Sequence, residues 1–154
     1  MKPQGTRMKV QLTADIYQRI AAAKVFIDEH YRDHIDLEQI AQRAFLSRFH
    51  FHRLFTRIYK RTPHQHITRI RLEAAKVLLA NEDISIAEVC NSVGFESIGS
   101  FILLFRRKNG YSPKRYRDKA LAQKRLAREQ PKRFIPHCFI EQYSLGVSPA
   151  DNGT

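Results

Sequence analysis

The sequence has too little cysteine for a disulfide framework, because Cys90 and Cys138 are its only cysteines and lie far apart. We interpret both as reduced thiols, the usual state in the cytoplasm. The sequence also lacks any run of about 18 apolar residues, the length that a membrane-spanning helix needs. The segment from Met1 to Lys9 has no apolar core that would predict a signal peptide. These absences predict a cytoplasmic protein with no membrane partner.

Glycine is nearly absent from residues 15–118 until Gly94, and no segment alternates apolar and polar residues as a strand would. Apolar residues recur at helical spacing instead, as in Ile16, Ile20 and Ile27. Seven helices are predicted, over residues 16–31, 37–44, 48–59, 63–81, 86–93, 98–109 and 113–120. The sequence therefore predicts an all-α fold.

Negative charge is scarce, since 15 acidic residues stand against 27 Lys and Arg, giving a net charge of +12. A charge of this size concentrates a protein near polyanions, so nucleic acid is the first candidate partner. Residues 47–61 and 101–117 contain no acidic residue, and each segment carries at least five basic ones. Both segments coincide with predicted helices and the turns that follow them, which favours contact with phosphates.

An internal repeat separates matching residues by 50 positions. The pairs include aromatic, hydroxyl and basic residues: Phe45/Phe95, Ser47/Ser97, Phe51/Phe101, Leu54/Leu104, Phe55/Phe105 and Arg57/Arg107. Each copy begins with a short helix that Asp36 or Ser85 can cap, followed by a turn and a second capped helix. A small residue in the first helix, Ala41 or Cys90, allows the two helices to cross closely. The repeat predicts two helix-turn-helix units.

One long helix is predicted between the copies, with an inward face made of apolar residues: Ile67, Ile70, Ala74, Val77 and Leu78. We expect it to hold the units at a fixed distance, because adjacent major grooves on one face of DNA lie about 34 Å apart. The predicted organisation is an N-terminal extension (1–14), a double helix-turn-helix domain (15–118) and a basic C-terminal extension (119–154). Within the domain, the first unit covers residues 15–62, the linker helix 63–81 and the second unit 82–118.

Residues 35–79 resemble the first half of the DNA-binding domain of AraC/XylS transcription regulators. Residues 85–117 resemble the second half, including its Gly-Phe-x-Ser turn at 94–97 and the Tyr-Arg pair at 116–117. The resemblance runs from about Ile16 to Arg117. It implies a seven-helix, homeodomain-like domain whose third and sixth helices enter adjacent major grooves of double-stranded DNA. It also favours a monomer on DNA that activates transcription, with RNA polymerase as a further candidate partner, in the cytoplasm at the nucleoid.

The resemblance places Phe49, His52 and Arg53 where family members contact bases or the adjoining backbone, and we add the neighbouring Arg48. Arginine suits this role because its planar fork can bond guanine O6 and N7 together. Phosphate contacts are predicted for hydroxyl and basic residues of both units: Ser47, Arg57, Lys60, Arg61, Ser97, Arg106, Arg107, Lys108 and Lys114.

The second unit departs from the family pattern at its recognition helix. Gly99 and Leu103 stand where polar or basic groove readers are common, and Ile102 replaces a small polar residue. We therefore expect the first unit to read most bases and the second to hold the backbone. Lys60 replaces the family's glycine after the third helix, and His66 replaces the tyrosine matched by Tyr116.

Other classes of function fit the sequence less well. The His50/His52 and His64/His66 pairs are spaced two apart on predicted helices, where their side chains diverge, so no metal site is predicted. Pro136-His137-Cys138 permutes the Pro-Cys-His centre of DNA alkyltransferases without the surrounding fold, and no phosphate-binding glycine loop is present. We predict a non-enzyme without cofactors.

The alternative is a protein–protein adaptor that docks a partner through its second unit or through the apolar tail stretch from Phe134 to Tyr143. An RNA-binding protein fits less well, because no aromatic-bearing sheet is predicted. The remaining segments leave no room for the effector-binding domain of many family members. Unless the sequence is a fragment of a longer protein, the chain is therefore expected to be of the stand-alone type, controlled by its abundance or by a partner.

Overall fold

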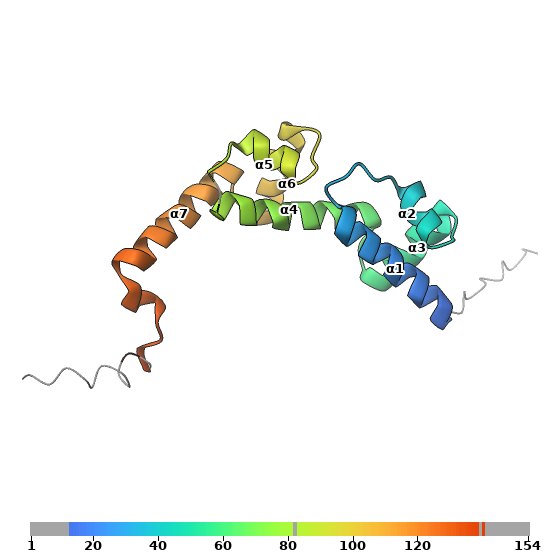
Figure 1. The fold of residues 1–154 in the computed structure, drawn as a ribbon, viewed down its shortest axis with the longest axis horizontal. Coiled ribbons are helices and arrows are strands. Elements are labelled where there is room, and N and C mark those ends of the chain that lie inside the picture. Colours follow the sequence, from blue (N-terminus) through green and yellow to red (C-terminus); the bar gives the residue numbers. More distant parts are fainter. Residues whose placement is uncertain (1–12, 82, 139, 141–154) are drawn as a thin grey trace, which may run out of the picture.

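The computed structural model describes residues 13–81, 83–138 and 140, and this part of the chain folds into helices without any strand (Figure 1). The α-helices are α1 (Ala14–His30), α2 (Leu37–Arg43), α3 (Arg48–Tyr59), α4 (Pro63–Asn81), α5 (Ile86–Ser92), α6 (Ile98–Asn109) and α7 (Pro113–Glu129). A short 3-10 helix, η1 (Pro131–Phe134), follows. The predicted all-α fold of seven helices is confirmed.

The helices begin where side chains can accept their free backbone N–H groups. Asp36 and Ser85 start α2 and α5 with complete capping boxes, in which Gln39 and Glu88 bond back to the cap. Simple caps start the other helices of the two units, from Thr13, Ser47, Ser97 and Ser112. Most helix starts could therefore be predicted from the sequence.

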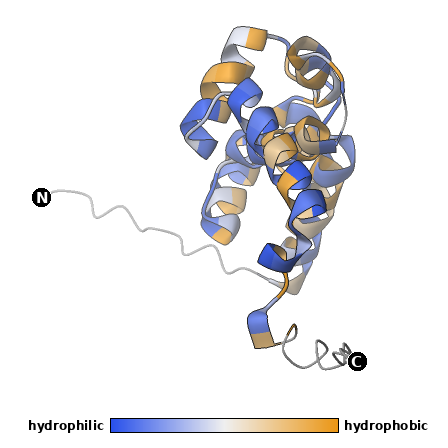
Figure 2. Ribbon diagram, turned by 90° about the vertical axis from the view of Figure 1, so that its left-hand side faces the viewer, coloured by the Kyte–Doolittle hydropathy of each residue, from blue (hydrophilic) through white to orange (hydrophobic). Residues whose placement is uncertain are grey.

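Two separate cores are built along α4. The first packs α1, α2 and α3 around Phe51 and Phe55, and α4 adds Ile67 to it. The second packs α5 and α6 around Phe101 and Phe105. We call the parts around these cores the first and second lobes. In Figure 1, α4 runs from one lobe to the other, and Figure 2 shows hydrophobic and hydrophilic segments alternating along the helices, as amphipathic packing requires.

The predicted inward face of α4 is wrong at Val77, whose side chain is 60% exposed. Ile67 and Ile70 face the first core, but Leu72, Ala75 and Leu79 supply the buried positions of the second. The helix serves two cores that approach it from different sides, so no single apolar stripe describes it. A one-stripe interpretation fails for that reason.

The turn of the second helix-turn-helix unit is one residue longer than that of the first. Leu46 N–H donates to the carbonyl of Ala41 at 3.1 Å, and Phe95 N–H donates to that of Cys90 at 3.0 Å. Phe95 therefore corresponds in structure to Leu46, and the predicted pairing of Phe45 with Phe95 is wrong. Phe45 instead takes the positive φ that Gly94 takes in the second turn, 53° against 87°. Its ring is left 81% exposed.

A loop of the first lobe is clamped onto the second lobe through Arg71 of α4. Its Nε donates to the carbonyl of Tyr31 at 2.6 Å and its Nη2 to that of Asp33 at 2.9 Å. The guanidinium also lies 5.8 Å from the centre of the Phe95 ring. Burial lowers the pKa of Arg71, yet two carbonyl acceptors and the ring hold the cation in place. The clamp ties the α1–α2 loop to the turn before α6.

Helix α7 ends at Glu129 rather than near residue 120, so it crosses the predicted start of the C-terminal extension. Its sequence between Lys119 and Glu129 holds only helix-favouring residues, and the first breaker is Pro131. Lys124 fixes α7 to the end of α4 by donating to Ala80 O and Asn81 Oδ1. Most of the predicted N-terminal extension and the tail beyond residue 140 lie outside the described residues.

His66 replaces the family's tyrosine without losing its packing role. Its ring lies 5.6 Å from that of Phe55, as Tyr116 lies 5.5 Å from Phe105 in the second lobe. His66 Nε2 also donates to the carboxylate of Asp28 at 2.9 Å, and Lys24 bonds the same carboxylate. Burial alone would raise the pKa of Asp28, but these hydrogen bonds outweigh it and lower the pKa.

Acid is expected to weaken the first lobe through Asp28. Because the pKa of Asp28 is lower in the folded protein than in the unfolded chain, its carboxylate stabilises the fold at any pH above the unfolded-state pKa. This stabilisation is lost as the pH falls through the folded-state pKa. Urea unfolding of wild type and Asp28→Asn between pH 6 and pH 2 checks this. The difference in unfolding free energy should be about 1 kcal/mol at pH 6, because the partly exposed carboxylate is screened by solvent, and it should vanish at the acid end. A constant difference would contradict the assignment.

Candidate nucleic-acid interface

Helix α3 presents its predicted base-reading residues to solvent. Phe51 and Phe55 turn into the core, whereas Phe49, His52 and Arg53 are exposed on the other side. The side chains of His52 and Arg53 form no hydrogen bond or ion pair with any described residue, so their donors are available to a ligand. The structure therefore brings these three residues to one surface, as their i, i+3 and i+4 spacing predicts.

Phe49 does not pack on its own lobe. Its side chain is 76% exposed, and the guanidinium of Arg48 lies 5.0 Å from the centre of its ring. The pair presents a flat apolar face beside a cation at the beginning of α3. Such a face can stack on a sugar or contact a thymine methyl group. Arg48 thus lies beside the base-reading candidates, as expected.

The corresponding face of α6 is apolar. Leu103 is 67% exposed, Ile98 45% and Ile102 37%, and no atom approaches closely where a Cβ on Gly99 would stand. No neighbouring group requires the glycine, so its effect is to leave the centre of this face without a side chain. The structure places no polar base-reading group at the positions that the family pattern uses.

The predicted phosphate-binding residues lie around the two recognition helices. Ser47 and Ser97 are exposed and accept the N–H of His50 and Ser100 as helix caps, which leaves each hydroxyl hydrogen free to donate. Six of the basic residues are exposed: Arg57, Lys60, Arg106, Arg107, Lys108 and Lys114. Arg61 is half-buried, and its Nε donates to Tyr59 O at 3.3 Å. None of these cations pairs with a carboxylate among the described residues.

Lys60 ends α3 in the left-handed conformation with φ 57°, as Gly110 ends α6 with φ 79°. Lys60 therefore carries the left-handed backbone strain that a glycine at this position would avoid. Its side chain stays exposed beside Arg57 and Arg61, where positive charge can reach a phosphate.

The described residues hold no cluster of three or more histidine, cysteine or acidic side chains that could bind a metal. His50 is half-buried and His52 exposed, so the two face different surroundings. Cys90 is buried, and burial raises the pKa of its thiol. No described helix is long and apolar enough to cross a bilayer.

Two residues near this surface escaped the sequence analysis. Phe45, which the sequence marks only as a member of the internal repeat, is exposed, with the Arg19 guanidinium 5.9 Å from its ring centre. Arg69 lies on α4 and is exposed, although that helix was interpreted only as a spacer. No one-dimensional pattern marks either residue, because exposure depends on tertiary packing.

The fold and this surface define a double helix-turn-helix domain. A family described as "Helix-turn-helix domain" matches residues 40–119. The chain is 37% identical over 91 residues to the probable transcriptional regulator LumQ of Photobacterium leiognathi, covering 59% of this chain and 37% of LumQ. It is 33% identical over 92 residues to the bifunctional transcriptional activator/DNA repair enzyme AdaA of Bacillus subtilis, covering 60% of this chain and 44% of AdaA.

Among solved structures, the DNA-binding domain of AdpA, crystallised with a target DNA, matches with a TM-score of 0.63 and 31% identity. The match covers 73% of this chain and 96% of that domain. The chain belongs to the AraC/XylS family of helix-turn-helix regulators. It spans less than half the length of LumQ and AdaA.

Proposed function

We propose that this chain binds double-stranded DNA sequence-specifically and regulates transcription, with α3 and α6 in adjacent major grooves. The main observation behind this proposal is that α3 and α6 are both exposed recognition helices and both begin at a serine cap. Each is followed by basic residues with no acidic residue among them, and both pack against α4. Family membership and the AdpA domain support the proposal. The proposal also includes an activating role, which relatives such as AdaA suggest. It further includes binding to DNA as a monomer and association with the nucleoid.

The two lobes divide the work in this proposal. Arg53, His52 and the Arg48/Phe49 pair read bases from α3. Arg106, Arg107, Lys108 and Lys114 hold phosphates beside α6, whose Leu103 and Ile102 can offer only apolar contact. We keep residues 15–118 as the DNA-binding domain and infer that the chain is not an enzyme. The buried Cys90, with its raised pKa, is a poor thiolate nucleophile.

Selection of bound duplexes from a random pool tests this division. We expect one half-site with sharp base preferences, read by α3, and one with weak preferences beneath α6. Equally sharp half-sites would contradict the division of work but leave DNA binding intact. Recovery of no preferred duplex would overturn the proposed function.

Salt dependence tests the electrostatic part. With roughly six to eight phosphate contacts, log Kd plotted against log salt should change with a slope of magnitude about 5–7. Titration of a labelled selected duplex between low and high salt measures it. A slope of magnitude near 1 would mean that the basic residues around α3 and α6 do not meet phosphates.

A second candidate function is that of an adaptor, favoured by the exposed Ile98, Ile102 and Leu103 on α6. This apolar strip could dock a protein such as RNA polymerase. Changing all three residues to serine separates the cases. A DNA-binding regulator keeps most of its affinity for the selected duplex, whereas an adaptor loses affinity for its protein partner.

A further inference from the structure

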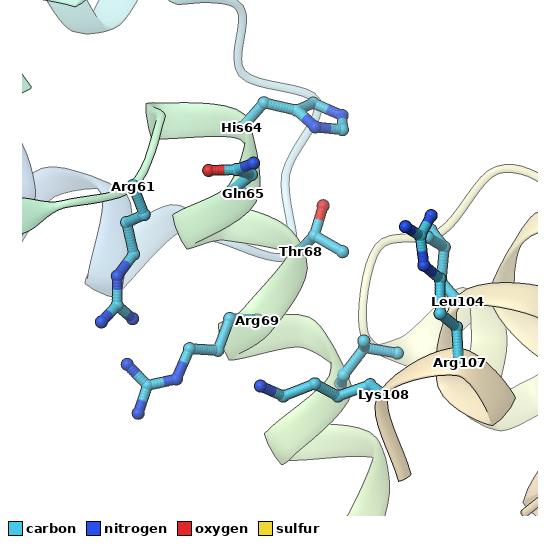
Figure 3. Close-up of a pocket in the computed structure, with 9 residues that line it drawn as sticks. Arg61, His64, Gln65, Thr68, Arg69, Leu104, Arg107 and Lys108 are labelled. Carbon is cyan, nitrogen blue, oxygen red and sulfur yellow. The ribbon is translucent and has the colours of Figure 1, made fainter. Parts of the chain in front are cut away.

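A basic cleft lies between the two lobes, with α4 along its length. Its walls come from Arg61 just before α4, from His64, Thr68 and Arg69 on α4, and from Arg107 and Lys108 at the end of α6. None of the described residues that line it is acidic. Figure 3 shows Arg61, Arg69 and Lys108 reaching into the same open space beside α4. Residues from both lobes therefore concentrate positive charge at one place.

The charges in this cleft are not used within the protein. Arg69 and Lys108 are exposed and form no hydrogen bond or ion pair with another described residue. Arg61 uses only its Nε, toward Tyr59 O. These three cations and Arg107, which pairs with no described carboxylate either, repel one another, so the arrangement favours a ligand with more than one negative charge.

The position of the cleft identifies that ligand. It opens just after the end of α3 and closes on the last turns of α6, so it lies between the two helices assigned to major grooves. Adjacent major grooves on one face of a duplex are separated by a minor groove bordered by two phosphate strands. With α3 and α6 in those grooves, as proposed above, basic residues between the lobes lie nearest to those phosphates.

We propose that Arg69, with Arg61 and Lys108, binds the backbone phosphates that border the minor groove between the two half-sites. Helix α4 is then a third DNA-contacting element as well as a spacer. Arg69 is the residue newly assigned, and the assignment rests on the proposed DNA-binding function. Because the contact is made to phosphates, it adds affinity at this position without reading bases.

The test uses the full chain and the duplex selected by wild type. Arg69→Gln should weaken binding about fivefold, as expected for loss of one solvent-exposed charge contact, and lower the salt slope by about 1. Base preferences should not change. Arg128→Gln, the matched control, removes an exposed charge from α7 outside the cleft and should leave affinity near wild type. Thermal unfolding of both variants verifies that they are folded.

A second duplex localises the contact, because it carries neutral methylphosphonate linkages only in the segment between the half-sites. It should weaken wild type several-fold and Arg69→Gln much less. Equal weakening of both proteins, or an Arg69→Gln affinity no lower than that of Arg128→Gln, overturns the assignment while the selected duplex upholds the proposed function. Titration of pyrophosphate into DNA-free protein supplies the other arm. The cleft would be assigned to a free phosphorylated ligand instead under two joint results. Wild type would bind pyrophosphate and Arg69→Gln would not, and the neutral linkages between the half-sites would leave duplex affinity unchanged.

Discussion

Gly94→Ala is expected to destabilise the protein by about 2–4 kcal/mol, from left-handed backbone strain and forced displacement of a packed neighbour. Gly94 has φ 87°, and a Cβ at this position would stand 2.5 Å from the carbonyl oxygen of Arg32. That oxygen belongs to the backbone of the clamped α1–α2 loop, so it cannot turn aside as a flexible side chain would. The added methyl group must therefore push the loop away from the second lobe.

Two other glycines provide matched controls for this variant. Gly110 has φ 79° but open space around its missing Cβ, so Gly110→Ala should cost only the strain, about 1 kcal/mol. Gly99 lies in α6 with only the Ser97 hydroxyl within 4 Å of the missing Cβ, so Gly99→Ala should stabilise by about 0.5–1 kcal/mol. Urea unfolding measures all three. If Gly94→Ala costs no more than Gly110→Ala, the loop does not press on Gly94 in solution.

Gly94 is also expected to affect DNA binding, because it contacts the loop that Arg71 ties to the second lobe. Arg71 joins the loop carbonyls to Phe95, and His34 lies 2.6 Å from the carboxylate of Glu96. The His34 contact is largely exposed and contributes little, because water and salt screen it. Arg71 and the Gly94 contact remain as the ties that set the orientation of one lobe against the other. Loss of the Arg71 or Gly94 contact should therefore weaken duplex binding, although neither residue lies on a recognition helix.

The helix boundaries could be predicted closely because side chains within a few residues determine where each helix starts. Asp36, Ser85, Ser112 and Pro113 cap or open helices through contacts within four residues, and such contacts survive in any tertiary setting. The family resemblance likewise placed Arg53 and His52 on an exposed face, since helical spacing fixes which residues share a side. Each of these predictions depends only on nearby sequence.

Most of the errors arose where distant parts of the chain meet. Val77 was placed inward because one stripe was assumed for α4, although two cores pack on it from different sides. The pairing of Phe45 with Phe95 fails for a local reason, because the extra residue of the second turn makes Leu46 the counterpart of Phe95. Arg69 and Arg71 have no local signature, because their partners come from the other lobe or from outside the chain. Burial and charge convergence become visible only in three dimensions.

Arg53→Ala is expected to weaken binding to the selected duplex by about 10- to 100-fold, the loss of one bidentate contact to a base. The side chain is exposed on the reading face of α3 and has no partner among the described residues, so its removal costs the fold little. The loss should concentrate at one base pair of the sharply read half-site, where the variant tolerates substitutions that wild type rejects. Competition binding with duplexes changed one pair at a time measures this.

Two further variants separate base reading from charge at this position. Arg53→Lys keeps the positive charge but loses the planar fork, so it should restore non-specific affinity while leaving that base pair poorly discriminated. Arg57→Ala, which removes an exposed arginine one turn later on α3, should weaken all duplexes uniformly and lower the salt slope by about 1. If Arg53→Lys discriminates as wild type does, or if Arg53→Ala behaves like Arg57→Ala, then Arg53 holds a phosphate. The reading of bases would then pass to His52 and the Arg48/Phe49 pair.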